Sequence, residues 1–256
     1  MLDKIISTLG GYQPVSLEKI ESIKLMNRVD TKYIVATETM INLLQMLPND
    51  YMALEINSQR FGQYQSIYYD TEDLKMFYAH VTARYPRFKV RNRTYSQNGN
   101  QFLEVKCKKI TGRTSKKRLP VNICEDNFND AEKSLISNNS PFQVEALQPK
   151  LINQFKRITL INKARTERLT FDFDLLFRNL NGDSTPTCKH AAIIEVKQEK
   201  KAESSIIRIL KNENIRPCGM SKYCVGMLLL YKNLSYKMYK SKFFKFIKTA
   251  QWVHYK

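Results

Sequence analysis

The feature that most constrains the fold is an alternation of charged and apolar side chains in several short segments. Successive side chains of a β-strand point to opposite faces, so a period of two marks a strand with two different faces. In residues 87–95 one face carries Arg and Lys, and the other carries Phe, Val, Asn and Thr. The same alternation occurs in residues 28–33, 102–108, 168–174 and 193–197. The chain therefore predicts a sheet with one strongly charged face.

Two architectures give such an alternation. A single amphipathic sheet packed on helices would turn its polar face to water, and we would then expect mixed Lys and Glu residues there. Here the polar faces are rich in Arg, and acids occur among them only at isolated places. Like charges on neighbouring strands repel, so such a face needs dispersal in water or an anion that neutralises it. The recurrence in five segments favours an α+β fold in which about eight antiparallel strands close into a barrel, with a charged lumen and flanking helices.

Local patterns place the strands and helices of this architecture. Runs of β-branched and aromatic residues predict strands, and apolar residues at helical spacing predict helices. Thr37 is the expected N-cap of the first of these helices. The expected strands span residues 28–35, 65–70, 86–95, 101–109, 116–123, 155–162, 166–175 and 191–198. The expected helices span residues 37–47, 72–80, 202–214 and 221–234.

The net charge of +18 is concentrated in two stretches. Residues 84–118 contain twelve basic residues and one acid, Glu104, and residues 232–256 contain seven Lys and no acid. An excess of this size points to a polyanionic partner. We therefore expect one domain over residues 1–234, followed by a basic amphipathic tail over residues 235–256.

Cysteine and histidine are few. Five Cys without a CxxC pair and only three His argue against a zinc site. The first residues lack the pattern of a secretory signal, and the most apolar run, residues 225–231, is far shorter than the roughly 20 residues that span a bilayer. We expect a reduced, cytoplasmic protein without a transmembrane segment.

The charged strand faces supply the side chains of a phosphate-binding lumen. Arg offers a planar fork that matches phosphate oxygens, and Lys offers a movable point charge. A row of such cations would hold several phosphates in succession. The basic residues expected in this lumen are Arg28, Lys32, Lys89, Arg91, Arg93, Lys106, Lys116, Arg118, Arg157, Arg168, Lys197 and Lys222.

Two acids stand at equivalent places in this pattern. Glu104 and Glu195 each precede a Lys by two residues, so each shares a strand face with that Lys. Carboxylate oxygens are the hard ligands that Mg²⁺ and Mn²⁺ prefer. A divalent metal together with many cations suits phosphoryl transfer, because catalysis there is mostly positioning and charge neutralisation. The chain has no GxxxxGKS/T motif, which excludes a P-loop enzyme.

Nine short motifs follow one another along the chain up to about residue 234. They are NRVDTKY (27–33), YYDT (68–71), KVRNR (89–93), FLEVK (102–106), GRTSKKR (112–118), FKR (155–157), ERLT (167–170), IEVK (194–197) and SKY (221–223). In this order they resemble the catalytic domain of the vacuolar transporter chaperone (VTC) polyphosphate polymerases, which lie within the triphosphate tunnel metalloenzyme (CYTH-like) superfamily.

The resemblance implies a closed antiparallel tunnel that binds ATP as phosphoryl donor, uses Mn²⁺ or Mg²⁺, and guides a growing polyphosphate chain. It implies that Glu195 ligates the metal with Glu104 as a helper, and that the basic lumen residues bind phosphate. It also implies that an export function would need a separate membrane protein as partner. The catalytic residues implied among the cations are Lys32, Arg91, Arg93, Arg157 and Lys222.

One departure from the superfamily bears on activity. The wider superfamily opens with an acidic ExExK pattern, whereas the same face here reads Arg28, Asp30 and Lys32. The loss of acids removes metal ligands used in triphosphate hydrolysis and adds phosphate contacts, which favours a polymerase or a binder over a hydrolase. The alternatives to an ATP-dependent polymerase are a triphosphatase on the same scaffold and a non-catalytic module that binds polyphosphate or nucleic acid. The ordered acids fit nucleic acid poorly, although aromatic residues near basic strands are typical of its readers.

The tail has the pattern of an amphipathic helix over residues 236–253. Such a helix could lie on an anionic membrane, at its inner face, or dock on a membrane protein. It could equally pack its apolar face on the outside of the barrel and leave its Lys residues in water. The residues of the apolar face are Tyr236, Tyr239, Phe243, Phe246, Ile247, Ala250 and Val253.

Overall fold

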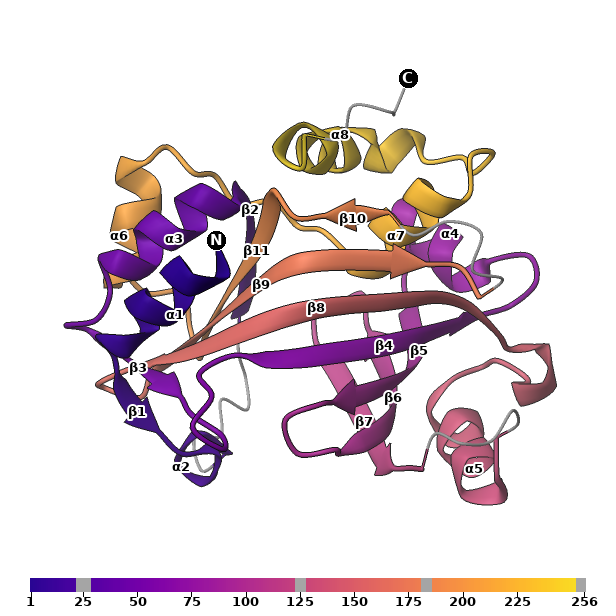
Figure 1. The fold of residues 1–256 in the computed structure, drawn as a ribbon. Helices are drawn as coiled ribbons and strands as arrows, with labels where there is room; N and C mark the ends of the chain where they lie inside the picture. Colours follow the sequence, from indigo (N-terminus) through magenta and orange to yellow (C-terminus); the bar gives the residue numbers. More distant parts are fainter. Residues whose placement is uncertain (22–28, 123–127, 181–185, 252–256) are drawn as a thin grey trace.

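The computed structural model describes residues 1–21, 29–122, 128–180 and 186–251, and it places eleven strands and eight α-helices in these ranges (Figure 1). The strands are β1 (Gln13–Val15), β2 (Val29–Ala36), β3 (Tyr51–Leu54), β4 (Gly62–Asp70), β5 (Arg87–Tyr95), β6 (Gln101–Lys108), β7 (Thr114–Pro120), β8 (Gln148–Asn162), β9 (Glu167–Arg178), β10 (Thr187–Cys188) and β11 (Ala191–Gln198). The α-helices are α1 (Leu2–Gly10), α2 (Leu17–Glu21), α3 (Thr37–Gln45), α4 (Lys75–Val81), α5 (Asp130–Asn139), α6 (Ser205–Asn212), α7 (Lys222–Leu230) and α8 (Lys240–Thr249). The 3-10 helices are η1 (Val144–Ala146) and η2 (Lys237–Tyr239).

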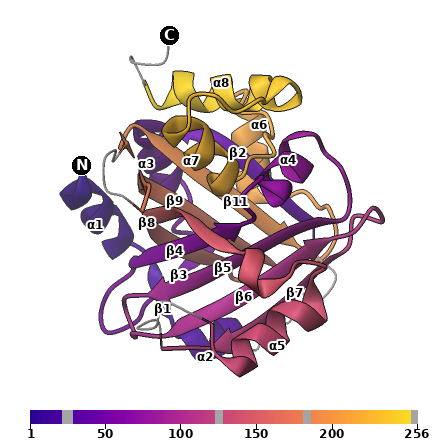
Figure 2. The same ribbon diagram turned by 90° about the vertical axis from the view of Figure 1, so that its right-hand side faces the viewer.

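All eleven strands belong to one curved sheet (Figures 1 and 2). Its main path is β2-β11-β9-β8-β4-β5-β6-β7, and each neighbouring pair on this path is antiparallel. A short parallel pair, β1 and β3, joins the sheet through β8, and β10 pairs with β9. The predicted α+β class and the antiparallel sheet are therefore confirmed.

Closure of the sheet into a barrel is not confirmed. In the described ranges, backbone hydrogen bonds do not join β2 to β7, the two ends of the path. The segment that leads into α7 lies along β2 instead, where the Cys218 amide donates to the Lys32 carbonyl at 2.7 Å. Lys32 of β2, Lys106 of β6 and Lys116 of β7 line one common pocket. Strands near the two ends of the sheet thus face one another through side chains rather than through backbone pairing.

Helices cover the outer, apolar face of the sheet (Figure 1). Helices α1, α3 and α6 pack on β2, β8, β9 and β11 in one cluster that includes Leu44, Phe171 and Ile194. Residues of α5 and η1 pack on β5 and β6 in a second cluster around Val90 and Leu103. The alternation in the sequence therefore separates an apolar outer face from a charged inner face.

Helix α7 packs inside the curve of the sheet. Residues 223–228 of this helix are all buried, which explains why its sequence is apolar on every side. The helix lies against β8 and β9, where Gly226 permits a close approach. A Cβ atom at this position would lie 2.6 Å from side-chain carbons of Leu151 and Phe177. This packing brings the N-terminus of α7 to the charged part of the inner face.

The predicted strands and helices are present, with differences at their ends. Strand β8 begins at Gln148 rather than at residue 155. Helix α3 begins at Thr37 itself, so the prediction of Thr37 as N-cap is wrong. Ala36 is the N-cap, and the Thr37 hydroxyl donates to the Lys189 carbonyl at 2.7 Å, which ties α3 to the loop before β11.

The last helix packs on the rest of the domain. The buried apolar side chains of η2 and α8 join the same cluster as α7, while Met238, Phe244 and the Lys residues are exposed or partly exposed. The packing alternative for the tail therefore agrees with the structure, and Val253 lies outside the described residues. The buried members of this face are Tyr239, Phe243, Phe246, Ile247 and Ala250.

Helices in the described ranges are all too short or too polar to cross a membrane. Four cysteines, Cys107, Cys188, Cys218 and Cys224, are buried with free thiols, and Cys124 lies outside the described residues.

Candidate functional site

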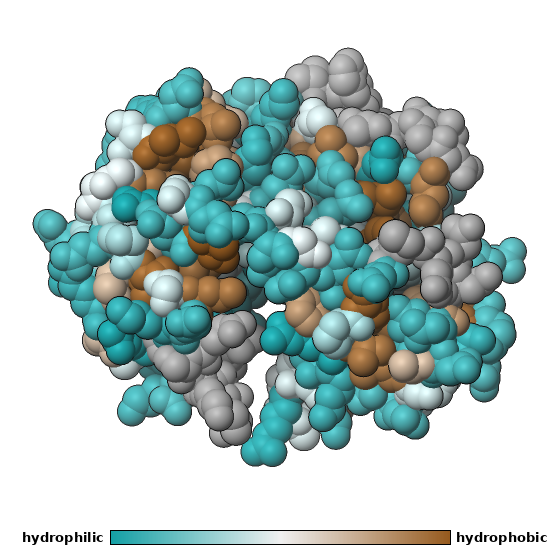
Figure 3. Space-filling model, turned by 60° about the horizontal axis from the view of Figure 1, so that its bottom comes forward, coloured by the Kyte–Doolittle hydropathy of each residue, from teal (hydrophilic) through white to brown (hydrophobic). Residues whose placement is uncertain are grey.

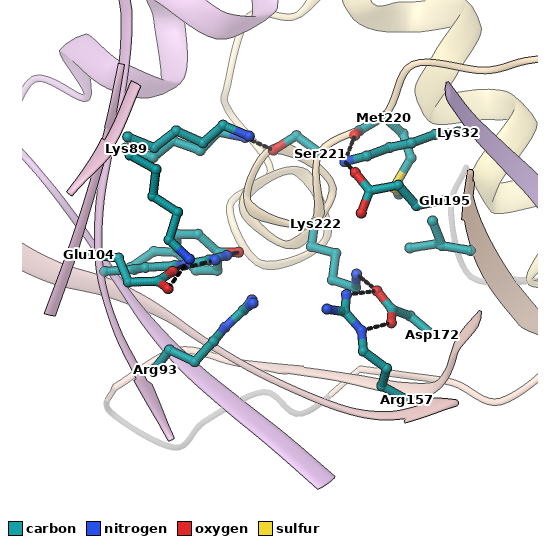
Figure 4. Close-up of a pocket in the computed structure, with 15 residues that line it drawn as sticks. Lys32, Lys89, Arg93, Glu104, Arg157, Asp172, Glu195, Met220, Ser221 and Lys222 are labelled. Atoms are coloured by element: carbon teal, nitrogen blue, oxygen red, sulfur yellow. Dashed lines mark hydrogen bonds and ion pairs between the residues drawn. The ribbon is translucent and has the colours of Figure 1, made fainter. Parts of the chain in front are cut away.

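The charged inner face of the sheet and the start of α7 enclose a pocket, which we call the basic pocket. Eight of its lining residues are Lys or Arg and three are acids. Figure 4 shows the labelled charged side chains pointing toward one another from several strands, and Figure 3 shows a hollow bordered by hydrophilic residues. The lining residues are Lys32, Tyr68, Lys89, Arg91, Arg93, Glu104, Lys106, Lys116, Arg157, Asp172, Ile193, Glu195, Met220, Ser221 and Lys222.

The basic pocket brings together ten of the fourteen residues that the sequence predicts for the site. They come from six strands and from α7, and they are far apart in the sequence. Their roles in binding and catalysis stay predictions. The ten are Lys32, Lys89, Arg91, Arg93, Glu104, Lys106, Lys116, Arg157, Glu195 and Lys222.

Of the other four predicted residues, Arg118, Arg168 and Lys197 do not line the basic pocket. Lys197 lies beside it and contacts Glu195 through its ammonium group. The Arg118 guanidinium lies 4.7 Å from the ring centre of Phe102. Arg168 pairs with Lys197 in the register of β9 and β11, and Arg28 lies outside the described residues.

Asp172 on β9 holds two of the pocket cations. Arg157 donates to it through two nitrogens, at 2.5 Å to Oδ1 and 2.7 Å to Oδ2, and Lys222 contacts Oδ2. Burial raises the pKa of Asp172, but Arg157 and Lys222 outweigh burial and hold that pKa well below its usual range. The geometry makes Asp172 a partner of these two cations.

Glu104 on β6 holds a second pair of cations. Arg91 donates to Oε2 through Nε at 2.8 Å and through Nη2 at 2.5 Å, and Lys116 contacts Oε1. The Glu104 side chain is only 2% exposed. Burial raises its pKa, but the two cations hold the pKa well below its usual value. Glu104 therefore stays ionised and fixes the direction of the Arg91 fork.

Glu195 on β11 is the pocket acid that fits a divalent metal best. Lys197 contacts Oε2, and Lys32 lies 3.6 Å from Oε1. The Glu195 side chain is 16% exposed, whereas that of Glu104 is 2% exposed, so Glu195 is the more accessible of the two carboxylates. A cluster of three metal-binding side chains is absent from the described residues. One carboxylate still fits Mg²⁺ or Mn²⁺, because such ions commonly bind through one or two carboxylates together with substrate phosphates and water.

Three pocket cations form no ion pair with any described residue. The Lys89 ammonium donates to Ser221 Oγ at 2.9 Å, and Arg93 donates through Nε to Ser66 Oγ at 3.1 Å. Arg93 is only 7% exposed, and burial lowers its pKa. Burial also lowers the pKa of Lys89, to about 7. Lys106, Lys89 and Arg93 are thus positive groups that a bound anion would stabilise.

The cations are arranged in rows along the strands. Arg93, Arg91 and Lys89 alternate along one face of β5, so successive rows are about 7 Å apart. Lys106 on β6 and Lys116 on β7 extend the Lys89 row across the sheet. Such rows match an extended ligand with several negative groups.

The N-terminus of α7 adds to the positive field of the pocket. Lys222 is its first residue and extends toward Arg157 and Asp172 (Figure 4). Ser221 is the N-cap and accepts from the Cys224 amide, and Lys32 donates to the Met220 carbonyl at 3.4 Å. The unpaired amides and the dipole at a helix N-terminus favour anions, so α7 and the strand cations act in the same sense.

Tyr68 on β4 is a pocket residue to which the sequence analysis assigned no role. Its ring stacks on Tyr223 at 5.2 Å, and its hydroxyl accepts from Arg91 Nη1 at 3.2 Å. Burial raises the pKa of Tyr68, but Arg91 and Arg93 outweigh burial, and the pKa falls to about 7. Strand β4 contains no Lys or Arg, so only its register with β5 reveals that Tyr68 meets the cations.

Comparisons with known proteins add a family to this geometry. The family model described as the VTC domain matches residues 27–231. No curated protein matches the chain.

Solved structures that match the chain share little sequence with it. A protein of Vibrio parahaemolyticus named as a candidate adenylate cyclase is 13% identical, with a TM-score of 0.45, and the match covers 77% of this chain and 95% of that one. A protein of Pyrococcus horikoshii is 14% identical, with a TM-score of 0.45, and the match covers 79% of this chain and 98% of that one. A Hippeastrum protein named as a candidate adenylyl cyclase with a dominant triphosphatase activity is 14% identical, with a TM-score of 0.46. The match covers 82% of this chain and 99% of that one.

Proposed function

We propose, from the premise that the chain belongs to the VTC domain family, that it transfers the γ-phosphate of ATP to a growing polyphosphate chain in the basic pocket. The observation that carries this proposal is the group of three pocket cations, Lys89, Arg93 and Lys106, that form no ion pair with described residues. A buried positive group of this kind costs stability until an anion neutralises it.

The ligand that fits best is a linear polyanion. The inner positions from Arg93 to Lys89 span about 13 Å along β5, which is longer than one phosphate group. Arg residues give rigid, forked contacts at one end of this distance, and Lys residues give movable ammonium contacts at the other end. A nucleoside triphosphate or a polyphosphate chain could contact several rows at once, whereas orthophosphate could contact only one.

The proposed reaction needs no general acid or general base from the pocket. An oxygen of the terminal phosphate of the chain attacks the γ-phosphorus of ATP and forms a new P–O bond. The bond between the γ-phosphorus and the β–γ bridging oxygen breaks, and ADP leaves with that electron pair. Arg91, Arg93 and Arg157 would hold the non-bridging oxygens, where negative charge is spread in the transition state.

Preorganisation supports these roles. Glu104 and Asp172 fix the forks of Arg91 and Arg157 before any ligand binds, so little reorganisation is needed during the reaction. Glu195 would hold Mn²⁺ or Mg²⁺ together with the phosphates. When bound, the metal would neutralise charge on the triphosphate.

The test is to incubate the purified full chain with ATP and Mn²⁺ and to score the products. We expect long-chain polyphosphate on a gel, with ADP formed in step and little free orthophosphate. Formation of orthophosphate without polymer would contradict the polymerase proposal and indicate a triphosphatase. Binding of ATP without formation of either product would indicate a non-catalytic binding module. Arg93→Met should abolish product formation, and Lys117→Met, an exposed residue whose position on β7 alternates with Lys116, is the charge-matched control.

A further inference from the structure

Four aromatic rings form a continuous row across neighbouring strands at one end of the basic pocket. The rings belong to Phe155 on β8, Tyr64 on β4, Tyr95 on β5 and Phe102 on β6. Successive ring centres are 5.3, 5.1 and 5.8 Å apart. Tyr64 pairs with both Phe155 and Tyr95 in the register of the sheet, so the row lies on the inner face. We call these four residues the aromatic row.

Much of the aromatic row is not needed to fill the core. Phe155 is buried and packs in the cluster around α7, which anchors the row. Tyr95 and Phe102 are partly exposed and belong to none of the four apolar clusters of the described residues. The Arg118 guanidinium lies 4.7 Å from the ring centre of Phe102 and covers part of that ring. The surface of Tyr95 and Phe102 that stays exposed is available to a ligand.

Pocket cations border the aromatic row. The Arg157 and Arg93 guanidinium groups lie 5.0 and 5.9 Å from the ring centre of Tyr64. On β5, Tyr95 lies two residues beyond Arg93 on the same face, a separation of about 7 Å. A flat apolar ring and a phosphate group of one ligand could thus be bound side by side.

We propose that the aromatic row stacks against the base of the phosphoryl donor, which makes the donor a nucleoside triphosphate and fixes its direction in the pocket. The inference rests on the proposed function, because it takes the cation rows to be the phosphate site. Aromatic side chains beside a basic groove stack bases of any sequence, since every base has a π-face. Inorganic tripolyphosphate has no ring, so it would gain nothing from Tyr95 or Phe102.

The same geometry sets the polarity of the reaction. The base lies at the end of β5 marked by Tyr95, and the phosphates extend from Arg93 toward Lys89. The γ-phosphorus then faces the lysine row of Lys89, Lys106 and Lys116. The polyphosphate acceptor approaches from that lysine row, opposite to the base.

The test compares two ligands in two variants. Dissociation constants for ATP and for inorganic tripolyphosphate are measured by calorimetry for the wild type, Phe102→Leu and Tyr95→Leu, at one salt and Mg²⁺ concentration. We expect each substitution to weaken ATP by about 5- to 150-fold, which is 1–3 kcal/mol per stacked base converted at 1.4 kcal/mol per tenfold. Tripolyphosphate should change by less than about twofold. Phe88→Leu, on the opposite face of β5 and packed on Phe142, is the matched aromatic control and should affect neither ligand.

The outcomes separate this inference from the proposed function. If both ligands weaken equally, or if neither does, the aromatic row does not contact the base and the inference fails while the phosphate site stands. If the wild type binds neither ligand, both proposals fail.

A variant that gains a fluorescence signal separates loss of ligand binding from loss of the fold. Phe102→Trp should still bind ATP, and its added fluorescence should be quenched by ATP but not by tripolyphosphate. Trp252, the single tryptophan of the chain, gives the background in the wild type. Equal responses to the two ligands would again overturn the inference.

Discussion

Replacement of Arg93 by Met should stabilise the ligand-free protein and weaken its binding of triphosphate. Arg93 is 7% exposed, and its one described hydrogen bond is to Ser66 Oγ. Burial lowers its pKa, and the charges of Arg91 and Arg157 lower it further, so the positive form is disfavoured in the empty pocket. Met keeps most of the length of the side chain and removes the charge.

The two effects have different sizes. A hydrogen bond to a charged group is worth about 1.5–3 kcal/mol, so the dissociation constant for tripolyphosphate should rise about 10- to 150-fold. Removal of a poorly compensated buried charge should add about 1 kcal/mol to the free energy of unfolding, because the lost Ser66 contact offsets part of the gain. At this chain length, 1 kcal/mol corresponds to a rise in Tm of about 2–4 °C.

Calorimetric unfolding with and without ligand gives the sharpest readout. At a tripolyphosphate concentration of 100 Kd, the wild type gains about 2.7 kcal/mol, whereas a variant with 30-fold weaker binding gains only about 0.9 kcal/mol. The order of Tm should therefore reverse, with the variant higher when empty and the wild type higher when saturated. Lys117→Met, which removes an exposed charge from β7, should leave both values nearly unchanged. An Arg93→Met protein that melts lower without ligand and binds as tightly as the wild type would show that Arg93 is structural.

Four further predictions follow from single contacts. Glu195→Gln should keep the fold but lose Mn²⁺-dependent turnover, which a Mn²⁺ titration of ATP consumption measures, and unchanged activity would exclude Glu195 as the ligand. Tripolyphosphate binding should weaken as pH rises above about 7, because burial lowers the pKa of Lys89 to about 7 and a bound anion favours its charged form. Calorimetry at pH 8 in buffers of different ionisation enthalpy should show proton uptake on binding, and binding without proton uptake would contradict the assignment. Gly226→Ala should lower the free energy of unfolding by about 1–3 kcal/mol in urea titrations, since its Cβ would overlap Leu151 and Phe177. Phe246→Ala should lower it by about 3–5 kcal/mol if α8 is part of the core, whereas a detached tail would show no effect.

Alternation along a strand is a local property, and for this reason the sequence predicts much of the site. Arg91 and Arg93 had to share one face of β5 once that segment was a strand, and Glu104 had to share a face with Lys106. Tyr68 shows the limit of this reasoning. Its strand contains no Lys or Arg, and the role of its hydroxyl depends on the register that places Tyr68 opposite Arg91.

Two other features depend on packing between distant segments. The alternating pattern states which face is charged, but it does not state whether β2 meets β7, which depends on the curvature of the whole sheet and on where α7 packs. The tail is a similar case, because one amphipathic pattern suits both a membrane and a protein surface. Only the positions of Phe243 and Phe246 in the cluster around α7 decide between them.

The balance of charge in the basic pocket explains how one surface can be stable when empty and still bind a polyanion. Eight cations without any acid would repel one another across neighbouring strands, and eight fully paired cations would leave no attraction for phosphate. Each of the three acids instead contacts two basic side chains, so repulsion is lowered and the forks of Arg91 and Arg157 are aimed. The cations that remain without an acid are the ones that a ligand can stabilise. The acids therefore set the affinity of the pocket by the number of cations that they leave free, and the loss of the Asp172 charge should destabilise the fold while it strengthens the attraction for phosphate.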